Sequence, residues 1–383
     1  MIFCICLFTA GLVNTNGQET LSDFKTKQEQ ELERFANENK IAIEALSSEY
    51  DLYAANQVRE FDQFQADVEK KWDTFESSTS KTWVDYDSDL RSRSSVNFEK
   101  GEIQIDVLVD KSAAKSEAQN LRAAQSLLEK KINKLVQQKA ADKQRLLKDQ
   151  MVTVDSKKVT TSNLKRFAAQ SVTSNYITHK TVRAKDGQPR TKYSVTIKMV
   201  PNHLEVRAKR FKGEILKQSK RFHIDPAVAF AVMQTESYFN PNARSHVPAY
   251  GLMQLVPKSG ARDAYQFVYK KDRLLKDSYL YNPANNIELG CAYLSKLRHV
   301  YFGDISDDRV AYHCTIAAYN TGPGNVSRAL TGTTKLAPAT EIANTKSPDQ
   351  IYRILLQKLP YDETKDYLTK VTSRVDNYRA WTE

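Results

Sequence analysis

The chain has 383 residues, which is long enough for two or three domains that each bury a core. Its 40% hydrophobic and 27% charged residues are ordinary for a soluble protein, and its formal net charge of +11 points to an anionic partner. The sequence contains no phosphate-binding loop, zinc-finger spacing or RNA-binding signature, so we expect no nucleic-acid partner. Because the basic residues are spread along the chain, solubilising surface charge explains the excess more simply.

Residues 1–17 resemble a secretory signal. The first 13 are apolar but too few to span a bilayer as a helix, and Ala10-Gly11 offers small residues for cleavage. A basic segment in front of this run is missing. Cys4 and Cys6 raise the question of a lipidated N-terminus, but neither follows a Leu-x-small pattern and both lie close to Met1. We therefore predict an exported protein and leave lipidation open.

The remaining cysteines, Cys291 and Cys314, have two readings. In an oxidising compartment they pair as a disulfide, whereas on two helices they are small buried side chains. The six histidines show no metal-ligand spacing. The sequence therefore predicts neither a metal site nor a cofactor.

Residues 18–203 predict an α+β domain of helices with an antiparallel sheet. Residues 21–75 form a polar helical pattern with one narrow apolar stripe, and packing on its own domain fits this stripe better than a coiled coil. Residues 77–95 predict a connecting segment, 102–109 a strand and 111–150 a helix. Two further strands are expected at 172–181 and 191–200, joined by a turn at 185–189. This domain presents no catalytic cluster, and we interpret it as a scaffold or interaction module.

Residues 204–383 predict an all-α domain. A basic amphipathic helix covers 204–221, and Asp225 and Pro226 are typical of the N-cap and first turn of the next helix. From there to the end, helical patterns alternate with loops and show little strand alternation. A domain boundary near residue 203 follows.

Glu236 stands near the end of this second helix, after an apolar run over 230–233 and before the helix-stopping Asn240-Pro241. A carboxyl group held against an apolar wall is shifted toward its protonated form, as a general acid requires at neutral pH. The alternative is a helix-end glutamate that points into water.

Two later stretches fit the same chemistry. Residues 250–255 (YGLMQL) combine a glycine, which permits close backbone approach, with a methionine and an amide. Residues 316–324 (IAAYNTGPG) place a phenol and an amide at a helix end that glycines terminate. Taken singly, each is explained by packing or by a helix stop.

In this order, Glu-Ser-x-Phe-Asn-Pro-x-Ala-x-Ser, Gly-Leu-Met-Gln-Leu and Ala-Tyr-Asn-x-Gly-x-Gly resemble the lytic transglycosylase family with a lysozyme-like SLT domain. Residues 282–294 are similar to the helix between the last two motifs. Residues 364–371 resemble the closing segment, with Leu368 in place of the usual valine. The resemblance covers about 210–383, and the layout of the N-terminal half is similar to membrane-bound murein members of the family.

The resemblance implies cleavage of the β-1,4 bond between N-acetylmuramic acid and N-acetylglucosamine in peptidoglycan, with a 1,6-anhydro product. Glu236 would act as the acid and then as the base, which requires a modestly raised pKa. The implied substrate-binding residues are Ser237, Ser245, Met253, Gln254, Tyr319, Asn320 and Tyr367. For Ser237, a local hydrogen bond to the backbone is the alternative.

The implied partners are peptidoglycan glycan strands, with outer-membrane attachment on the periplasmic side and a cell-wall enzyme complex formed through the N-terminal domain. Two other functions stay open. A goose-type lysozyme would keep the fold but use water as the nucleophile, and a non-catalytic protein would bind peptidoglycan without cutting it.

Overall fold

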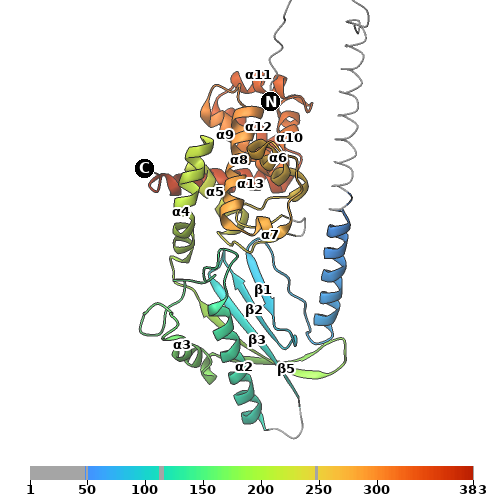
Figure 1. The fold of residues 1–383 in the computed structure, drawn as a ribbon, viewed down its shortest axis with the longest axis vertical. Helices are drawn as coiled ribbons and strands as arrows, with labels where there is room; N and C mark the ends of the chain where they lie inside the picture. Colours follow the sequence, from blue (N-terminus) through green and yellow to red (C-terminus); the bar gives the residue numbers. More distant parts are fainter. Residues whose placement is uncertain (1–47, 49–50, 112–115, 246–248, 383) are drawn as a thin grey trace, which may run out of the picture. The chain divides into compact units, whose positions relative to one another are not determined.

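The computed structural model describes residues 48, 51–111, 116–245 and 249–382 (Figure 1). These fall into two units, which meet between Val58 and Arg59, and the fold described below is that of the unit from Arg59 onward. The signal-like segment at 1–17 and the predicted helical stripe up to residue 47 lie outside the described residues.

A five-stranded antiparallel sheet forms the first part of this unit, with the strand order β1-β2-β3-β5-β4 (Figure 1). The strands are β1 (Thr82–Tyr86), β2 (Ser92–Asn97), β3 (Glu102–Asp110), β4 (Thr178–Arg183) and β5 (Pro189–Lys198). The central pair aligns Ile105 with Val195. The β4–β5 turn contains Gly187 at φ +73°, a conformation that favours glycine.

One face of the sheet is covered by α2 (Glu117–Gln137), and α3 (Leu164–Ser171) packs on α2. Ser116 starts α2 with a capping box to Gln119, in which each side chain accepts from the backbone N–H of the other residue. Leu128 and Ile132 of α2 are fully buried in one apolar core with Ile103 and Ile105 of β3. Alternation along β3 thus supplies this core.

Residues 59–75 pack on the other face. The helix that covers 51–69 is followed by Trp72, which lies in a second core with Leu108 of β3 and whose indole donates to the Leu90 carbonyl oxygen (2.8 Å). Phe64 meets the ring of Tyr86 edge to face. The predicted aromatic stripe therefore packs on its own domain in this part of the chain.

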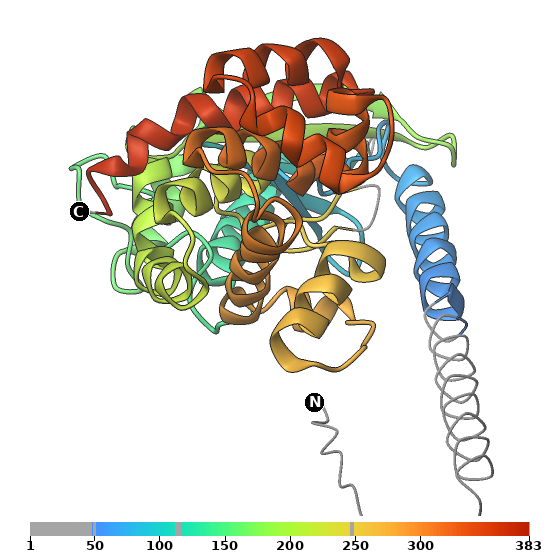
Figure 2. The same ribbon diagram turned by 90° about the horizontal axis from the view of Figure 1, so that it is seen from above.

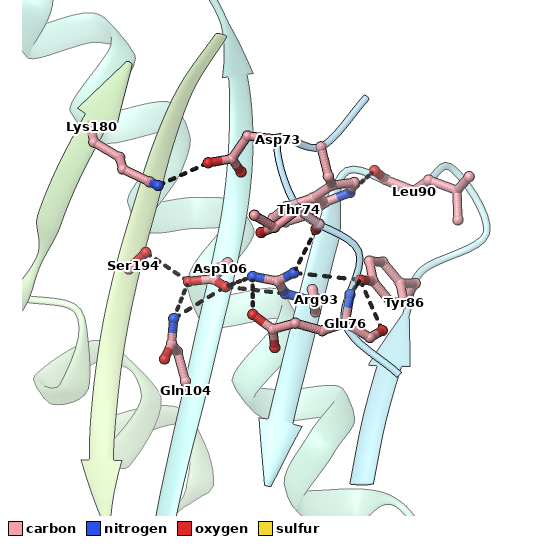
Figure 3. Close-up of polar contacts among 11 residues, drawn as sticks. Asp73, Thr74, Glu76, Tyr86, Leu90, Arg93, Gln104, Asp106, Lys180 and Ser194 are labelled. Atoms are coloured by element: carbon pink, nitrogen blue, oxygen red, sulfur yellow. Dashed lines mark hydrogen bonds and ion pairs between the residues drawn. The ribbon is translucent and has the colours of Figure 1, made fainter. Parts of the chain in front are cut away.

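A buried ion pair lies on this face of the sheet (Figure 3). The guanidinium of Arg93, 0% exposed, is 2.6 Å from the carboxylate of Asp106, 1% exposed. Glu76 lies 2.8 Å from the same guanidinium, and the Ser194 hydroxyl donates to Asp106 (2.6 Å). Burial opposes the charge of Arg93, but its partners Asp106, Tyr86 and Glu76 outweigh that cost and raise its pKa.

The second part of the unit is helical, and Figure 2 shows its last helices, in red, lying over the earlier ones. Its helices are α4 (His203–Phe222), α5 (Pro226–Ser237), α6 (Arg262–Tyr269), α7 (Asp277–Leu280), α8 (Pro283–Lys296), α9 (Asp308–Thr321), α10 (Pro323–Thr331), α11 (Leu336–Asn344), α12 (Pro348–Lys358) and α13 (Asp362–Arg379). In the described residues after β5, strand-like pairing is limited to isolated bridges. Helices α5 and α9 are buried on nearly all sides, and α13 packs on both.

The predicted fold class, an α+β domain followed by an all-α domain, is confirmed. The prediction for 77–95 is wrong, because β1 and β2 lie there. The Asp side chains of this segment, which are typical of loops, find a partner on another element, because Lys131 of α2 donates to Asp85 of β1 (2.7 Å) and to Asp87 (3.0 Å). The helix predicted for 111–150 ends at Gln137, and 172–181 contains only the start of β4. The proposed division near 203 stays a prediction.

Cys291 and Cys314 are both free and buried, so the disulfide reading is wrong. Burial raises the pKa of each thiol to about 12. Across the described ranges, no helix combines the length and apolarity needed to cross a bilayer, and no group of three or more His, Cys, Asp or Glu side chains is arranged to hold a metal ion.

Candidate active site

Helix α5 begins as predicted. The Asp225 carboxylate accepts from the Ala227 amide (2.8 Å), and Pro226 occupies the first turn, where its missing N–H costs nothing. The residues from Ala227 to Gln234 are all buried. This helix therefore places Glu236, its second-last residue, at the edge of the core.

The end of α5 is sharp. Tyr238 and Phe239 both adopt left-handed backbone conformations (φ +50° and +59°), which turn the chain away after Ser237. The fully buried Ser237 hydroxyl lies 2.6 Å from the Leu252 carbonyl oxygen and 3.2 Å from that of Met233. Its hydroxyl thus joins α5 to the 250–255 loop. This is the local hydrogen bond to the backbone that the sequence offered as the alternative to substrate binding.

Glu236 is half-buried at the end of α5, and its carboxyl group is largely desolvated. Burial raises its pKa to about 8, the nearby hydroxyl of Tyr367 works in the opposite direction, and the negative charge of Glu363 raises it further. The pKa of the Tyr319 and Tyr367 phenols is raised well above the usual range by burial, with the Glu236 charge adding to it. Both phenols therefore lie within electrostatic reach of the carboxyl.

The 250–255 loop is held by one buried asparagine on α8. Asn286 accepts from the Met253 amide (2.8 Å) and donates to the carbonyl oxygens of Tyr250 (2.9 Å) and Leu280 (2.8 Å). Gly251 has φ +75°, and a Cβ atom there would lie 2.5 Å from the Asn286 side chain. The close approach predicted for Gly251 is thus present.

Met253 is fully buried beside Gly290 of α8. A Cβ atom at Gly290 would lie 2.2 Å from the Met253 sulfur, so only glycine leaves room for this side chain. The carbonyl oxygen of Met253 accepts from the Tyr319 hydroxyl of α9 (2.8 Å). The second and third sequence motifs meet through this hydrogen bond.

A pocket of about 240 Å³ lies beside these groups, lined by Gln254, Leu255, Val256, Ser259, Gly260, Tyr293, Tyr319, Asn320, Thr321 and Gly322. The amide nitrogen of Gln254 donates to the Gly251 carbonyl oxygen (2.9 Å). Its amide oxygen is buried and has no hydrogen-bond partner in the described part of the chain. An unpaired buried acceptor is costly, so this oxygen is suited to a ligand donor.

Helix α13 completes the site from the far end of the chain. The Thr364 hydroxyl donates to the amide oxygen of Asn320 (2.6 Å), a residue that lines the pocket. The hydroxyl of Tyr367 is buried and makes no hydrogen bond in the described structure, although it lies near Glu236. The Tyr367 hydroxyl thus lies where it can donate to the Glu236 carboxyl.

The structure therefore brings Glu236, Met253, Gln254, Tyr319, Asn320 and Tyr367 together. Ser245 belongs to the loop that follows α5, where its hydroxyl accepts from the Ala249 amide (3.3 Å), and it is not among the residues that line the pocket. The sequence did not single out Asn286, Glu363 or Thr364. The available signal for Asn286 was an amide side chain directly before Ile287, where the apolar residues of α8 begin.

Two protein-family models match parts of this chain. Residues 214–342 match the transglycosylase SLT domain. Residues 48–210 match the N-terminal domain of membrane-bound lytic murein transglycosylase C. Residues 214–342 are therefore similar to a transglycosylase SLT domain. The predicted resemblance is thereby confirmed, including its likeness to membrane-bound lytic murein transglycosylase C.

Curated relatives point the same way. The chain is 38% identical over 205 residues to membrane-bound lytic murein transglycosylase C of Klebsiella pneumoniae subsp. pneumoniae, which covers 54% of this chain and 56% of the relative. The protein of the same name from Sodalis glossinidius is 41% identical over 187 residues, 49% of this chain and 52% of the relative. The matched segment thus spans about half the length of these relatives.

Among solved structures, an inactive mutant of the lytic transglycosylase Slt from Pseudomonas aeruginosa is 31% identical with a TM-score of 0.33, covering 44% of this chain and 24% of that one. The 70 kDa soluble lytic transglycosylase of Escherichia coli is 22% identical with a TM-score of 0.34, covering 45% and 24%.

Proposed function

We propose that this protein is a peptidoglycan lytic transglycosylase that cleaves the β-1,4 bond between N-acetylmuramic acid and N-acetylglucosamine. The observation that carries the proposal is Glu236, whose pKa of about 8 keeps its carboxyl protonated at neutral pH beside the pocket of an SLT domain. A protonated carboxyl can donate to the oxygen of a leaving sugar.

The reaction uses Glu236 twice. It donates its proton to the glycosidic oxygen as the bond from that oxygen to C1 of the muramyl ring breaks, and the N-acetyl group of the substrate stabilises the resulting cation. The muramyl 6-hydroxyl oxygen then bonds to C1 while the Glu236 carboxylate takes its proton. This balance restores the acid and yields the 1,6-anhydro ring.

Recognition of the N-acetyl group would fall to the two pocket amides. The unpaired oxygen of Gln254 accepts from the acetamido N–H, and the nitrogen of Asn320 donates to the acetamido oxygen. Tyr367 would donate to the carboxylate form of Glu236 after the first step. Met253 and Tyr319 would hold the loop that carries Gln254 in place. Ser245 would contact the glycan from its own loop.

Glu363 favours a second candidate, the goose-type lysozyme. Its negative charge lies close enough to raise the pKa of Glu236, and inverting glycosidases use a second carboxylate to activate water. Residues 363–371 belong to α13, whose Tyr367 faces the same carboxyl. The family matches favour the transglycosylase of the two.

Mass spectrometry of the muropeptides released from purified sacculi decides between them. The anhydro product is one water lighter than the hydrolytic product, and we expect the anhydro form from the wild-type protein. Release of reducing ends would establish the hydrolase instead. Binding to sacculi without any release would favour the non-catalytic alternative.

We further propose that the protein is exported to the periplasm and attached to the outer membrane, in line with the names of its curated relatives. Its sheet domain would serve as the contact to other cell-wall enzymes. Fractionation of cells tests the first statement, because recovery in the cytosolic fraction would contradict it.

A further inference from the structure

The residue two positions after Glu236 is anchored in the sheet domain. Tyr238 is 8% exposed, and its ring lies in the apolar core that α2 and the strands build, whereas Phe239 lies in the core of the helical domain. The end of α5 is therefore shared between two cores. The left-handed backbone of both residues must be held by contacts outside the helix.

The side chain of Tyr238 is fixed by a charged pair. Its hydroxyl donates to the carboxylate of Glu99 (2.6 Å), in the turn between β2 and β3, and accepts from Arg374 of α13 (2.8 Å). Burial opposes the charge of Glu99, but the hydrogen bonds from Tyr238 and Lys81 outweigh it and lower its pKa. An ionised acceptor makes the Tyr238 hydrogen bond a strong one.

The backbone of Tyr238 is fixed by a second buried cation. Arg207 of α4, 2% exposed, donates to the Tyr238 carbonyl oxygen (2.9 Å) and to the Phe98 carbonyl oxygen of the β2–β3 turn (2.6 Å). It also donates to the side-chain oxygen of Gln150 (2.8 Å). One guanidinium thus joins the end of the catalytic helix to two loops of the sheet domain.

The same contacts flank Glu236 from the other side. Arg374, which holds Tyr238, also donates to the hydroxyl of Thr235 (2.9 Å), the residue before Glu236. The Gln234 side chain accepts from the Tyr378 hydroxyl (2.8 Å). The direction of the Glu236 side chain therefore depends on neighbours that are held by α13 and by the sheet domain.

We propose that the sheet domain positions the catalytic acid, with Tyr238 as the positioning residue and Glu99 and Arg207 as its anchors. This inference rests on the proposed function, because it assigns to the sheet domain a role in that reaction. Loosening the anchor lets the end of α5 move, and small displacements of a reacting group reduce turnover more than binding.

Tyr238→Phe is the sharpest test, because it keeps the buried ring and removes only the hydroxyl that meets Glu99 and Arg374. On soluble glycan strands we expect kcat to fall about 10- to 100-fold while KM stays within about twofold. Glu99→Gln should lower kcat in the same direction, and the double variant should lose little more than Tyr238→Phe alone. Tyr176→Phe, an exposed tyrosine of the sheet domain (63% exposed), is the matched control and should match wild type.

A second measurement does not need activity. The pH range over which Glu236→Gln becomes more stable than its parent reports the pKa of Glu236. It is measured in the wild-type background and in the Tyr238→Phe background. We expect the upper end of this range to fall and the gain in stability to shrink in the Tyr238→Phe background, because a displaced carboxyl regains water and its folded pKa falls toward the unfolded value. An unchanged kcat with an unchanged pH range would reduce Tyr238 to a packing residue. Absence of anhydro muropeptides from wild type would overturn the proposed function while this pH range still decides the positioning.

Discussion

Two regions of the molecule bury charge-bearing groups and treat them in opposite ways. In the sheet domain, Arg93 and Asp106 are almost fully buried, but they lie 2.6 Å apart and the Ser194 hydroxyl donates to the Asp106 carboxylate. At the end of α5, the Glu236 carboxyl is largely desolvated, with no cation among the causes that set its pKa, which rises to about 8. The ion pair joins β2 to β3, whereas the carboxyl of Glu236, which has no cation beside it, holds a proton that it can transfer.

The largest effect is expected when the acid itself is removed. Glu236→Gln keeps the shape of the side chain and removes the transferable proton, so the rate of muropeptide release should fall by about 10²- to 10⁴-fold. Digestion of purified sacculi followed by chromatography measures it. Glu341→Gln, an exposed glutamate of α11, serves as the control and should keep the wild-type rate. Normal release by Glu236→Gln would remove the assignment of the acid.

Asp106→Asn removes the carboxylate of the buried ion pair with Arg93. It leaves Arg93 buried with only Glu76 as a carboxylate partner, and we expect a loss of about 3–5 kcal/mol in the free energy of unfolding of the sheet domain. Urea denaturation followed by tryptophan fluorescence reports it through Trp72, which lies over the Arg93 guanidinium (4.6 Å). Asp67→Asn, which opens an exposed pair with Lys70, should leave the midpoint unchanged. A loss no larger than that of the control would contradict the role given to the pair.

A pH series sharpens the contrast. Above its unfolded pKa of 4.5 the Glu236 carboxyl of the unfolded chain releases its proton, while the folded protein keeps it until about pH 8. The unfolded state thus binds fewer protons, and stability falls as pH rises through this window. Glu236→Gln removes that loss, so we expect it to be more stable than wild type by about 2–4 kcal/mol above about pH 8.

Denaturation midpoints of both proteins at about pH 5 and about pH 9 measure this difference, which should be small at the lower pH and large at the higher one. The Glu341→Gln control should show no such divergence. A constant difference across the range would mean that the carboxyl of Glu236 titrates normally.

The smallest expected effect concerns the packing behind the acid. Gly290→Ala pushes against the sulfur and Cβ of Met253, 2.2 Å and 2.9 Å from the new methyl group, and should cost about 1–3 kcal/mol of stability. Gly213→Ala on α4 meets nothing within 4 Å, and it should be neutral or stabilising. Thermal unfolding of the two variants compares them, and equal melting temperatures would show that Met253 moves aside freely.

Much of the candidate site could be predicted from local sequence. Asp225-Pro226 marks the start of α5, the apolar run that follows explains why Glu236 is desolvated, and the order of the three motifs gives the family. The weak points were equally local. Ser, Thr and Asp over 77–95 predict a loop, yet Lys131, more than 40 residues away, binds Asp85 and Asp87 in and beside β1. The prediction for 111–150 is too long because helical periodicity does not mark where the packing partner ends.

By itself the sequence determined where α5 begins, which glutamate follows its apolar run, and that an α+β domain precedes a helical one. The tertiary structure decided that Ser237 holds a loop instead of lining the pocket, that Gln254 keeps an unpaired acceptor, and that α13 brings Tyr367 to Glu236. It also decided that the Tyr238 ring packs in the core of the sheet domain. The physical reason is range: caps and periodicity act between neighbours along the chain, whereas desolvation and hydrogen-bond completion depend on groups more than 100 residues apart, as between Tyr238 and Glu99.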